Sequence, residues 1–400
     1  MARTVLTGAR IFDGTGGDPA PGDIAFEDGR IVDVGQRLDG DEAVDVTGRT
    51  ILPGLFDCHV HVVLSSIDHW RVVQLPFSYR FYEAARNLAA TLRAGITTVR
   101  DAGGADLGIK RALADGLIDG PRLEISLAMI SQTGGHGDDW MPFGGEVALL
   151  PAHPGVPSSI VDGPDEMRRV VRQLIRMGAD VLKVATSGGV LSPRDDPRHA
   201  HFRSAELDVL VEEATAAGKW VMAHAQASDG IKNAVRSGVR SIEHGVYLDD
   251  EAIELMLEHG TWLVPTLVAP QGVIDAAAAG AQIPEASLAK AREVVDVHRD
   301  SFGRAVRAGV KVAMGTDSGV TAHGQNLREL ALMAAGGMAP RDVLLATTRN
   351  AAELMGIGDE VGTLEPGKVA DLTVVSGEPY DLTGLPDCVE AVYQAGRLVS

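Results

Sequence analysis

The chain has 400 residues, of which 45% are hydrophobic and 23% charged, the balance of a globular protein with one large domain and a smaller one. Its formal net charge is −19 at pH 7, so it lacks the basic face that nucleic acids and anionic membranes require, and we expect neither partner. No apolar run reaches the length of about 18 residues that spans a bilayer, and no signal-peptide pattern is present. Cys58 and Cys388 lie too far apart in the sequence to form a disulfide framework. We therefore expect a reduced, cytoplasmic protein.

Both ends of the chain show the pattern of short β-strands. They contain β-branched runs that Asp-Gly and Gly turns interrupt. These runs occupy residues 4–14, 23–35, 49–54, 361–367, 370–377 and 389–400. Because neither end is long enough to bury a core alone, we predict one small sheet domain that residues 1–56 and 356–400 build together.

Between these ends, apolar runs of strand length alternate with amphipathic helical segments. The runs lie at 55–64, 97–101, 122–131, 180–186, 219–225, 241–245, 261–267 and 310–319. Helical periodicity fits the gaps, for example at 165–178, 204–217, 228–238 and 249–259. Strand and helix repeated eight times over about 300 residues predict a (β/α)8 barrel for residues 57–355. A doubly wound open sheet is the alternative, although no glycine-rich nucleotide-binding motif follows the first run.

Polar residues that can bind a metal ion follow several of these runs, at the ends of strands where barrels carry their active sites. His59 and His61 lie two residues apart, so both side chains leave the same face of the first strand. His224, His244 and Asp317 end the fifth, sixth and eighth strands. Each alone has a structural interpretation, as a hydrogen-bonded core histidine or a helix cap. Together they predict a divalent-metal site.

Lys183 is the unusual residue of the fourth strand, because its neighbours in Val-Leu-Lys-Val-Ala are apolar. Burial of an ammonium group is costly and favours the neutral amine, which can react with carbon dioxide to form a carbamate. A carbamate has two oxygens and can bridge two metal ions. The alternative is an ordinary lysine, paired with a buried acid or turned to solvent. Because the other five polar residues also lie at strand ends, the metal-site interpretation of Lys183 is favoured.

At these residues the chain resembles the metal-dependent amidohydrolase superfamily. The resemblance implies an α/β fold, a TIM barrel with a small β-sandwich domain formed by both termini, and it extends from the motif at 56–61 to the motif at 361–371. It also implies two divalent metal ions, with zinc favoured by the ligand types. The implied ligands are His59, His61 and Asp317 for the more buried ion, His224 and His244 for the more exposed one, and carbamylated Lys183 as the bridge.

Further motifs resemble one branch of this superfamily, the imidazolonepropionase-like proteins with the Xaa-Pro dipeptidases (prolidases) and related carboxypeptidase-type hydrolases. They lie at 130–138, 186–190, 196–202, 241–245 and 315–326. In that branch the histidine that matches His136 is associated with the substrate. Dipeptidase members commonly carry a tyrosine after the fifth-strand histidine, where this chain has Gln226, which can donate a hydrogen bond but lacks the phenol. Tyr247, three residues after His244, could replace that tyrosine or simply begin the approach to a helix.

The long loops carry the other candidates for substrate binding. A substrate with a carboxylate needs a local positive or hydrogen-bond-donating group in a chain of net charge −19. The candidates are His136, Gln226, Tyr247, Arg194, Arg203, His201 and His323. Residues 268–290, with their alanine-rich stretch, form either a lid over the site or a plain linker.

The resemblance implies hydrolysis of a C–N amide bond in a small molecule, in the first place a dipeptide or an N-acyl amino acid. Asp317 would transfer the proton, and His136 would stabilise the oxyanion or anchor the substrate. Lactams, carbamates and ureas are alternative substrates. A mononuclear imidazolone hydrolase or deaminase is a further alternative, but such deaminases carry a glutamate where this chain has Ala227 and do not need Lys183. A non-catalytic scaffold is disfavoured because no ligand is missing, and homo-oligomers are compatible with the fold.

Overall fold

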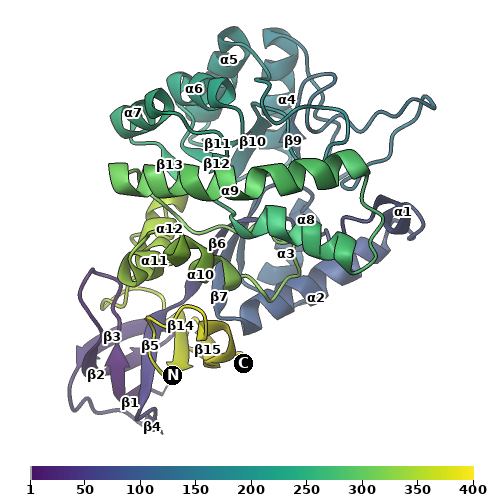
Figure 1. Ribbon diagram of the computed structural model, residues 1–400. Coiled ribbons are helices and arrows are strands. Elements are labelled where there is room, and N and C mark those ends of the chain that lie inside the picture. Colours follow the sequence, from purple (N-terminus) through teal and green to yellow (C-terminus); the bar gives the residue numbers. More distant parts are fainter. Residues whose placement is uncertain (1) are drawn as a thin grey trace.

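The computed structural model describes residues 2–400 and shows a small sheet domain at one end of a larger α/β body (Figure 1). The purple and yellow segments, from the two ends of the chain, lie together in the sheet domain. The blue, teal and green segments form the α/β body.

Eight strands from both ends of the chain form one hydrogen-bonded sheet. Its order is β16-β15-β14-β5-β1-β2-β3, and β4 also pairs with β1. The strands are β1 Thr4–Ile11, β2 Ala20–Glu27, β3 Arg30–Gly35, β4 Glu42–Asp45, β5 Arg49–Pro53, β14 Leu372–Ser376, β15 Val389–Gln394 and β16 Arg397–Leu398. The two ends meet where β14 runs antiparallel to β5, with Leu372 opposite Pro53. The expectation that both ends share one sheet is therefore confirmed, while the two-layered sandwich stays a prediction.

Strand β1 changes partners along its length. Its first half pairs with β4 and its second half with β5, and its register against β2 shifts between Leu6 and Ala9. Such a bulge bends a strand and increases its twist. The predicted strand at 361–367 does not form. Gly362 and Gly367 have φ of +92° and +93° there, so the backbone bends and turns.

The remaining strands run parallel and follow the predicted chain order. They form a three-stranded sheet, β6-β7-β8, and a five-stranded sheet, β13-β12-β11-β10-β9. Their bounds are β6 Leu55–Val60, β7 Ile96–Asp101, β8 Arg122–Ile125, β9 Met129–Ile130, β10 Val181–Ala185, β11 Trp220–Ala225, β12 Ser241–His244 and β13 Trp262–Val264. With helices between the strands, this is a TIM-barrel-like α/β fold.

Two segments connect the parallel sheets. The predicted strand at 122–131 is interrupted, and its first part, β8, pairs with β7 while its second part, β9, pairs with β10. Residues 310–319, predicted as the eighth strand, form only isolated bridges, and Asp317 near the end of this segment takes a φ of +61° that a regular strand does not allow. This segment still hydrogen-bonds to both sides, from Leu263 of β13 to the amides of Cys58 and His61. It therefore holds Asp317 beside the end of β6.

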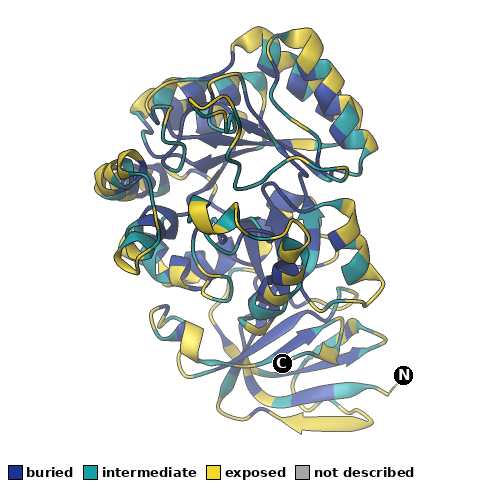
Figure 2. Cartoon of the chain, turned by 90° about the vertical axis from the view of Figure 1, so that its right-hand side faces the viewer, coloured by how far each residue is buried: buried dark blue, intermediate teal, exposed yellow. Residues whose placement is uncertain are grey.

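Helices surround the parallel strands (Figure 1). They are α1 His69–Val72, α2 Tyr79–Arg93, α3 Leu107–Ala114, α4 Pro164–Arg176, α5 Ser204–Ala216, α6 Ser228–Ser237, α7 Asp250–His259, α8 Val268–Ala278, α9 Glu285–Ala308, α10 Arg328–Ala335, α11 Pro340–Ala346 and α12 Arg349–Met355. Helices α4 to α7 match the four predicted helical segments. Figure 2 shows the parallel strands mostly buried and the outward faces of the helices exposed, as amphipathic helices around central strands require.

Residues 268–290 form α8 and the beginning of α9. Glu329 of α10 accepts hydrogen bonds from the amides of Leu267 (2.7 Å) and Val268 (2.8 Å), which satisfies donors at the start of α8. Between α8 and α9, the amide of Gln282 donates to Asp68 (3.1 Å). This segment is therefore anchored at its beginning and in the loop between the two helices.

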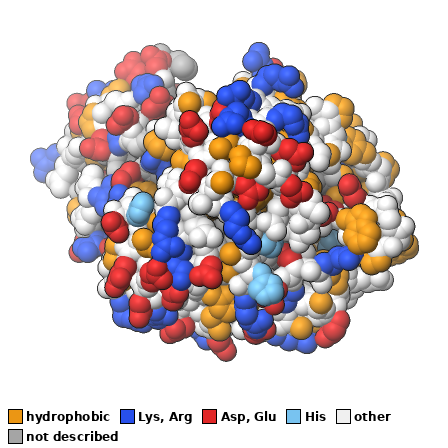
Figure 3. All heavy atoms as spheres, turned by 90° about the horizontal axis from the view of Figure 1, so that it is seen from above, with side chains coloured by type: hydrophobic (Ala, Val, Ile, Leu, Met, Phe, Trp, Pro, Cys, Tyr) orange, Lys and Arg blue, Asp and Glu red, His pale blue; other side chains and the backbone are white. Residues whose placement is uncertain are grey.

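Acidic and basic side chains alternate over the face in Figure 3, without a broad area of either sign. Within residues 2–400, no helix has the length and apolar character that crossing a membrane requires. The boundaries predicted for the two domains stay a prediction.

Candidate active site

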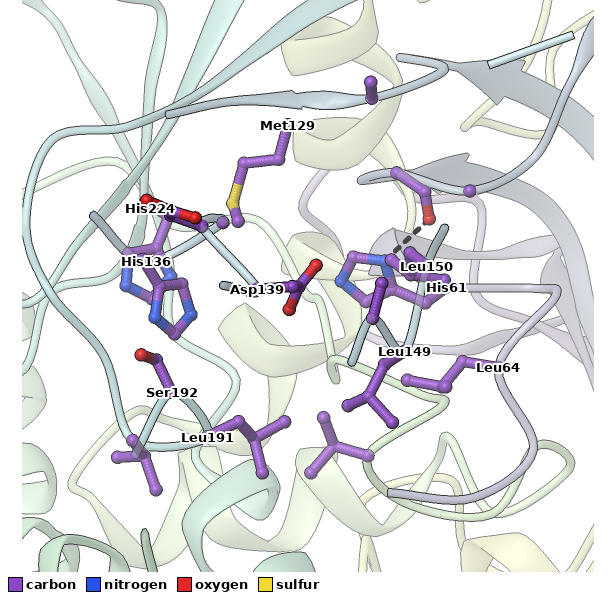
Figure 4. Close-up of a pocket in the computed structure, with 18 of the residues that line it drawn as sticks. His61, Leu64, Met129, His136, Asp139, Leu149, Leu150, Leu191, Ser192 and His224 are labelled. Atoms are coloured by element: carbon purple, nitrogen blue, oxygen red, sulfur yellow. Dashed lines mark hydrogen bonds between the residues drawn. The ribbon is translucent and has the colours of Figure 1, made fainter. Parts of the chain in front are cut away.

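A cavity of about 330 Å³ lies at the carboxyl ends of the parallel strands. All six predicted metal ligands line it: His59, His61, Lys183, His224, His244 and Asp317. Strands β6, β10, β11 and β12, the residue after β6 and segment 310–318 supply these side chains from positions up to 258 residues apart in the sequence. Figure 4 shows part of the cavity, with His61 on one side and His136 and His224 on the other.

His59, His61 and Asp317 converge at the end of β6. Nδ1 of His59 donates to Oε2 of Glu243 (2.7 Å), and Nδ1 of His61 donates to the carbonyl oxygen of Gly103 (2.8 Å). Because these partners only accept, Nδ1 of each ring carries a proton, and Nε2 is the nitrogen that can bind a metal ion once it is deprotonated. These Nε2 atoms lie 3.5 Å and 3.3 Å from Oδ1 of Asp317. Two nitrogen lone pairs and a carboxylate oxygen therefore face one point, which is an arrangement that fits a divalent cation.

His244 joins this cluster and links it to His224. Ligand atoms of His59, His244 and Asp317 all lie within 4.8 Å of one another, and the rings of His224 and His244 have centroids 4.6 Å apart. Nε2 of His224 donates to the carbonyl oxygen of Gly188 (3.1 Å), which leaves Nδ1 as its free nitrogen. Burial lowers the pKa of His59, His224 and His244 well below the usual range, so the rings are neutral, the form that binds metals.

Two of these residues have strained backbones. The φ angles of His244 and Asp317 are +75° and +61°, a region that residues other than glycine rarely adopt. Such conformations persist where the surrounding structure enforces them, and they concentrate at functional sites. Here they place both side chains at the floor of the cavity.

Lys183 lies in the middle of β10 with its side chain in the cavity wall. It is 1% exposed, and its Nζ has no hydrogen-bond partner among the described residues. Burial lowers the pKa of Lys183 to about 8, which increases the fraction of neutral amine. An unpartnered amine among metal ligands fits the chemistry of a bridging carbamate.

His136 stands over the other side of the cavity, on the loop after β9. Its ring stacks on that of His224, with centroids 4.2 Å apart and planes 18° apart. Its Nδ1 lies 3.1 Å from Oδ2 of Asp195. A Cβ added at Gly189 would lie 2.2 Å from Cε1 of His136, so only glycine there leaves room for the ring.

Comparison with known proteins identifies the family. The profile of the Amidohydrolase family matches residues 50–399. The chain belongs to this family. As an amidohydrolase it is a hydrolase acting on carbon–nitrogen bonds, and its relatives generally bind divalent metal ions.

Three similar proteins indicate the branch of the family to which the chain is related. Ochratoxinase of Aspergillus niger is 35% identical over 369 residues, which cover 87% of this chain and 75% of that protein. Imidazolonepropionase of Geobacillus sp. (strain WCH70) is 26% identical over 419 residues, which cover 94% and 86%. A crystal structure of a Xaa-Pro dipeptidase with methionine bound in its active site has a TM-score of 0.89 at 32% identity and covers 99% of both chains. The predicted membership in the imidazolonepropionase-like and prolidase-like branch is confirmed.

Two buried charged residues of this amidohydrolase, Glu243 and Arg100, are not among the predicted site residues. Glu243 lies one residue before His244 and is fully buried. It accepts hydrogen bonds from His59 and from Nη2 of Arg100 (3.0 Å), while Nε of Arg100 donates to the carbonyl oxygen of Cys58 (2.7 Å). Glu243 therefore fixes the orientation of the His59 ring. The alternation along β12, which makes Ser241 and Glu243 share a face, could have pointed to it.

Three more residues of the site, His298, Asp195 and Lys290, were not predicted from the sequence. Nε2 of His298, on α9, donates to the carbonyl oxygen of His244 (2.8 Å). Asp195 holds His136, and Nζ of Lys290 in turn donates to Oδ1 of Asp195 (3.0 Å). Neither the spacing nor the periodicity of the sequence marks these residues, because α9 and the loop after β10 meet only in the folded chain.

Of the predicted substrate-binding residues, His136, Gln226 and Arg194 line the cavity of the amidohydrolase. The Oε1 atom of Gln226 is buried without a hydrogen-bond partner in the described chain, so it is available to a ligand. The guanidinium of Arg194 stacks on Trp140, with Cζ 4.7 Å from the ring centroid.

Tyr247, His201, His323 and Arg203 lie outside the cavity lining within the described chain. The hydroxyl of Tyr247 donates to Glu293 (3.3 Å). Nε2 of His323 donates to the carbonyl oxygens of His61 (3.2 Å) and Leu64 (3.1 Å), beneath the site. Their side chains follow the paths of their loops, which sequence spacing does not specify.

Proposed function

We propose that this amidohydrolase cleaves the amide bond of a small dipeptide or N-acyl amino acid in the cavity at the ends of the parallel strands. The observation that carries the proposal is the convergence of four imidazoles, one carboxylate and one unpartnered amine on the cavity floor. The similarity to a Xaa-Pro dipeptidase across the whole chain supports a dipeptide as substrate.

The free ligand atoms support two metal ions. His59, His61 and Asp317 would hold the first ion through the atoms that face one another at 3.3–3.5 Å. His224 and His244 would hold the second, and a carbamate on Lys183 would bridge the two. Imidazole and carboxylate ligands favour zinc. When bound, the ions would polarise the amide carbonyl and lower the pKa of a water molecule toward neutrality.

The residues of the chain supply proton transfer and positioning. The carboxylate of Asp317, at the floor of the cavity, would take a proton from the attacking water and deliver it to the leaving nitrogen. Because Nδ1 of His136 is engaged by Asp195, its Nε2 is the nitrogen available to the substrate. Since Nδ1 already donates to Asp195, Nε2 can donate only when the ring is an imidazolium, and its hydrogen bond would then stabilise the developing oxyanion or hold a substrate carboxylate. Apolar side chains of the cavity, such as Leu149 and Leu191, would contact the side chains of the substrate.

We also propose that the two parallel sheets form a closed eight-stranded barrel over residues 57–355. The hydrogen bonds of residues 310–318 to Leu263 and to the amides of Cys58 and His61 support this closure. Residues 1–56 and 356–400 would form the β-sandwich domain, and the change of partners along β1 supports a sheet that folds over itself.

The test combines metal content with product release. Metal per chain is measured by inductively coupled plasma mass spectrometry after growth with zinc and bicarbonate. Amino acid release is measured on a panel of dipeptides, including Xaa-Pro, and N-acyl amino acids. Two ions per chain with release from the panel are expected. Two ions without release would move the substrate to lactams, carbamates or ureas, and one ion would favour the mononuclear imidazolone hydrolase or deaminase.

A further inference from the structure

Asp139 is a charged residue in the cavity to which the proposed mechanism gives no task. It lies three residues after His136, and Figure 4 shows its carboxylate within the cavity. No hydrogen bond or ion pair joins this carboxylate to another described residue. Its backbone is fixed, because the carbonyl oxygen of Asp139 accepts a hydrogen bond from the amide of Val147 (3.0 Å).

The surroundings of Asp139 leave its charge unbalanced. Leu149, Leu150 and Leu191 belong to the same cavity (Figure 4). Burial raises the pKa of Asp139 to about 7, and the nearby Glu146 acts in the same direction against the opposing effect of His136. An ionised carboxylate in an apolar site is stabilised strongly by a cation that hydrogen-bonds to it.

The cation of Arg194 does not fill this role. It stacks on the Trp140 ring, and its Nη1 donates to the carbonyl oxygen of Trp140 (3.3 Å). The described chain forms no salt bridge with Asp139, whereas Asp317 in the cavity pairs with His61 and the neighbouring Asp195 pairs with Lys290. A positively charged ligand group would therefore be the first ionic partner of this carboxylate.

We infer that Asp139 binds the α-ammonium group of the substrate, so that the site selects dipeptides with a free amino terminus over N-acyl amino acids. This inference rests on the proposed amide hydrolysis, and it specifies the class of substrate that is hydrolysed. The apolar walls favour an ammonium group beside an aliphatic side chain, which is the chemistry of an amino-terminal leucine or methionine residue. An N-acyl amino acid offers no positive charge, and its binding would leave the Asp139 carboxylate buried without a partner.

Matched substrates test this inference. Leucyl-proline and 4-methylpentanoyl-proline differ only in the ammonium group, and 6-aminohexanoyl-proline carries its ammonium group at the far end of the acyl chain. We expect kcat/KM to be at least about tenfold higher for leucyl-proline than for the other two, because a hydrogen bond between charged groups stabilises a complex by about this factor. Asp139→Asn should abolish this preference without loss of bound metal. Glu146→Gln, which removes an exposed negative charge from the same loop, should retain it.

Three results would overturn the inference. An equal preference in the wild type and in Asp139→Asn would show that another group recognises the amino terminus. An equal loss in Glu146→Gln would assign the effect to the charge of the whole loop. Loss of metal from Asp139→Asn would make Asp139 a ligand.

A binding measurement separates this inference from the proposed hydrolysis. Calorimetry compares leucine with 4-methylpentanoate on the metal-loaded protein. Tighter binding of leucine, lost in Asp139→Asn, would support the ammonium site even if no amide of the panel were cleaved. Equal affinities, or no binding of either compound, would contradict it.

Discussion

The imidazole of His136 and the carboxylate of Asp195 form a pair across two loops, with Nδ1 and Oδ2 3.1 Å apart. The amide of Gly189 donates to the same carboxylate oxygen (3.1 Å), and Lys290 binds the other one. Nζ of Lys290 also donates to the carbonyl oxygens of Gly189 and Ser192. The loop after β10 is thereby tied to α9 and holds one face of the cavity in place.

Asp195→Asn is expected to lower kcat about tenfold while the metal content stays unchanged. The amide preserves the shape but removes the charge that orients His136. His136→Ala should lower kcat about 100-fold, as the loss of an oxyanion donor does. Steady-state kinetics on the best substrate of the panel provides the measurement. If Asp195 acts through His136, the double variant should have the same kcat as His136→Ala. A kcat lowered by the product of the two single effects would indicate independent roles.

Lys183→Ala should remove most of the bound metal and most of the activity, because the bridging group between the two sites is lost. Metal analysis of the purified protein measures the effect directly. Lys311→Ala serves as the control, since Lys311 is half-exposed in segment 310–318, pairs with Glu353 at 3.6 Å and lies over the Trp262 ring, away from the cavity lining. A Lys183→Ala protein with full metal content and activity would refute the bridging carbamate.

Glu243→Gln is expected to destabilise the metal-free protein by about 3 kcal/mol, the cost of leaving a buried charge without its partner. The charge is that of Arg100, whose side chain is 3% exposed. The midpoint of urea unfolding at neutral pH measures this change. Glu353→Gln, at an exposed site, should leave the midpoint unchanged. Equal midpoints for Glu243→Gln and the wild type would mean that Arg100 finds another acceptor.

Glu329 should make the protein less stable as the pH rises. Burial raises the pKa of Glu329 to about 8, against 4.5 for an ordinary glutamate. Between these values the folded chain holds a proton that the unfolded chain has released, so the free energy of unfolding falls with increasing pH. Glu329→Gln cannot titrate and should show a shallower fall between about pH 5 and pH 8 in urea unfolding. Identical slopes for both proteins would show that Glu329 does not titrate in this range.

That the six proposed metal ligands line one cavity could be predicted, because their positions depend mostly on regular structure. His59, His224 and His244 lie on strands whose order and direction follow from alternating apolar runs and helices, so their ends meet at one face. Lys183 was recognisable because a charge within an apolar strand must be buried. These predictions needed only the periodicity of each element.

Other features depend on contacts that no local pattern encodes. The predicted eighth strand, 310–319, forms isolated bridges because the backbone at Asp317 turns to a positive φ. Asp195 meets His136 through two separate loops, and Tyr247 turns away to Glu293 of α9. Side chains on loops take their direction from the whole path of the backbone, and the sequence alone does not specify that path.

The pairing of β5 with β14 has a consequence for synthesis of the chain. Pro53 of β5 lies opposite Leu372 of β14. The ribosome therefore makes the partner strand of β5 only after the entire α/β body. During that interval β5 presents an unpaired edge, the kind of edge that invites association with other chains. Pairing with β14 covers this edge, so protection against misassembly comes only after the α/β body has been translated.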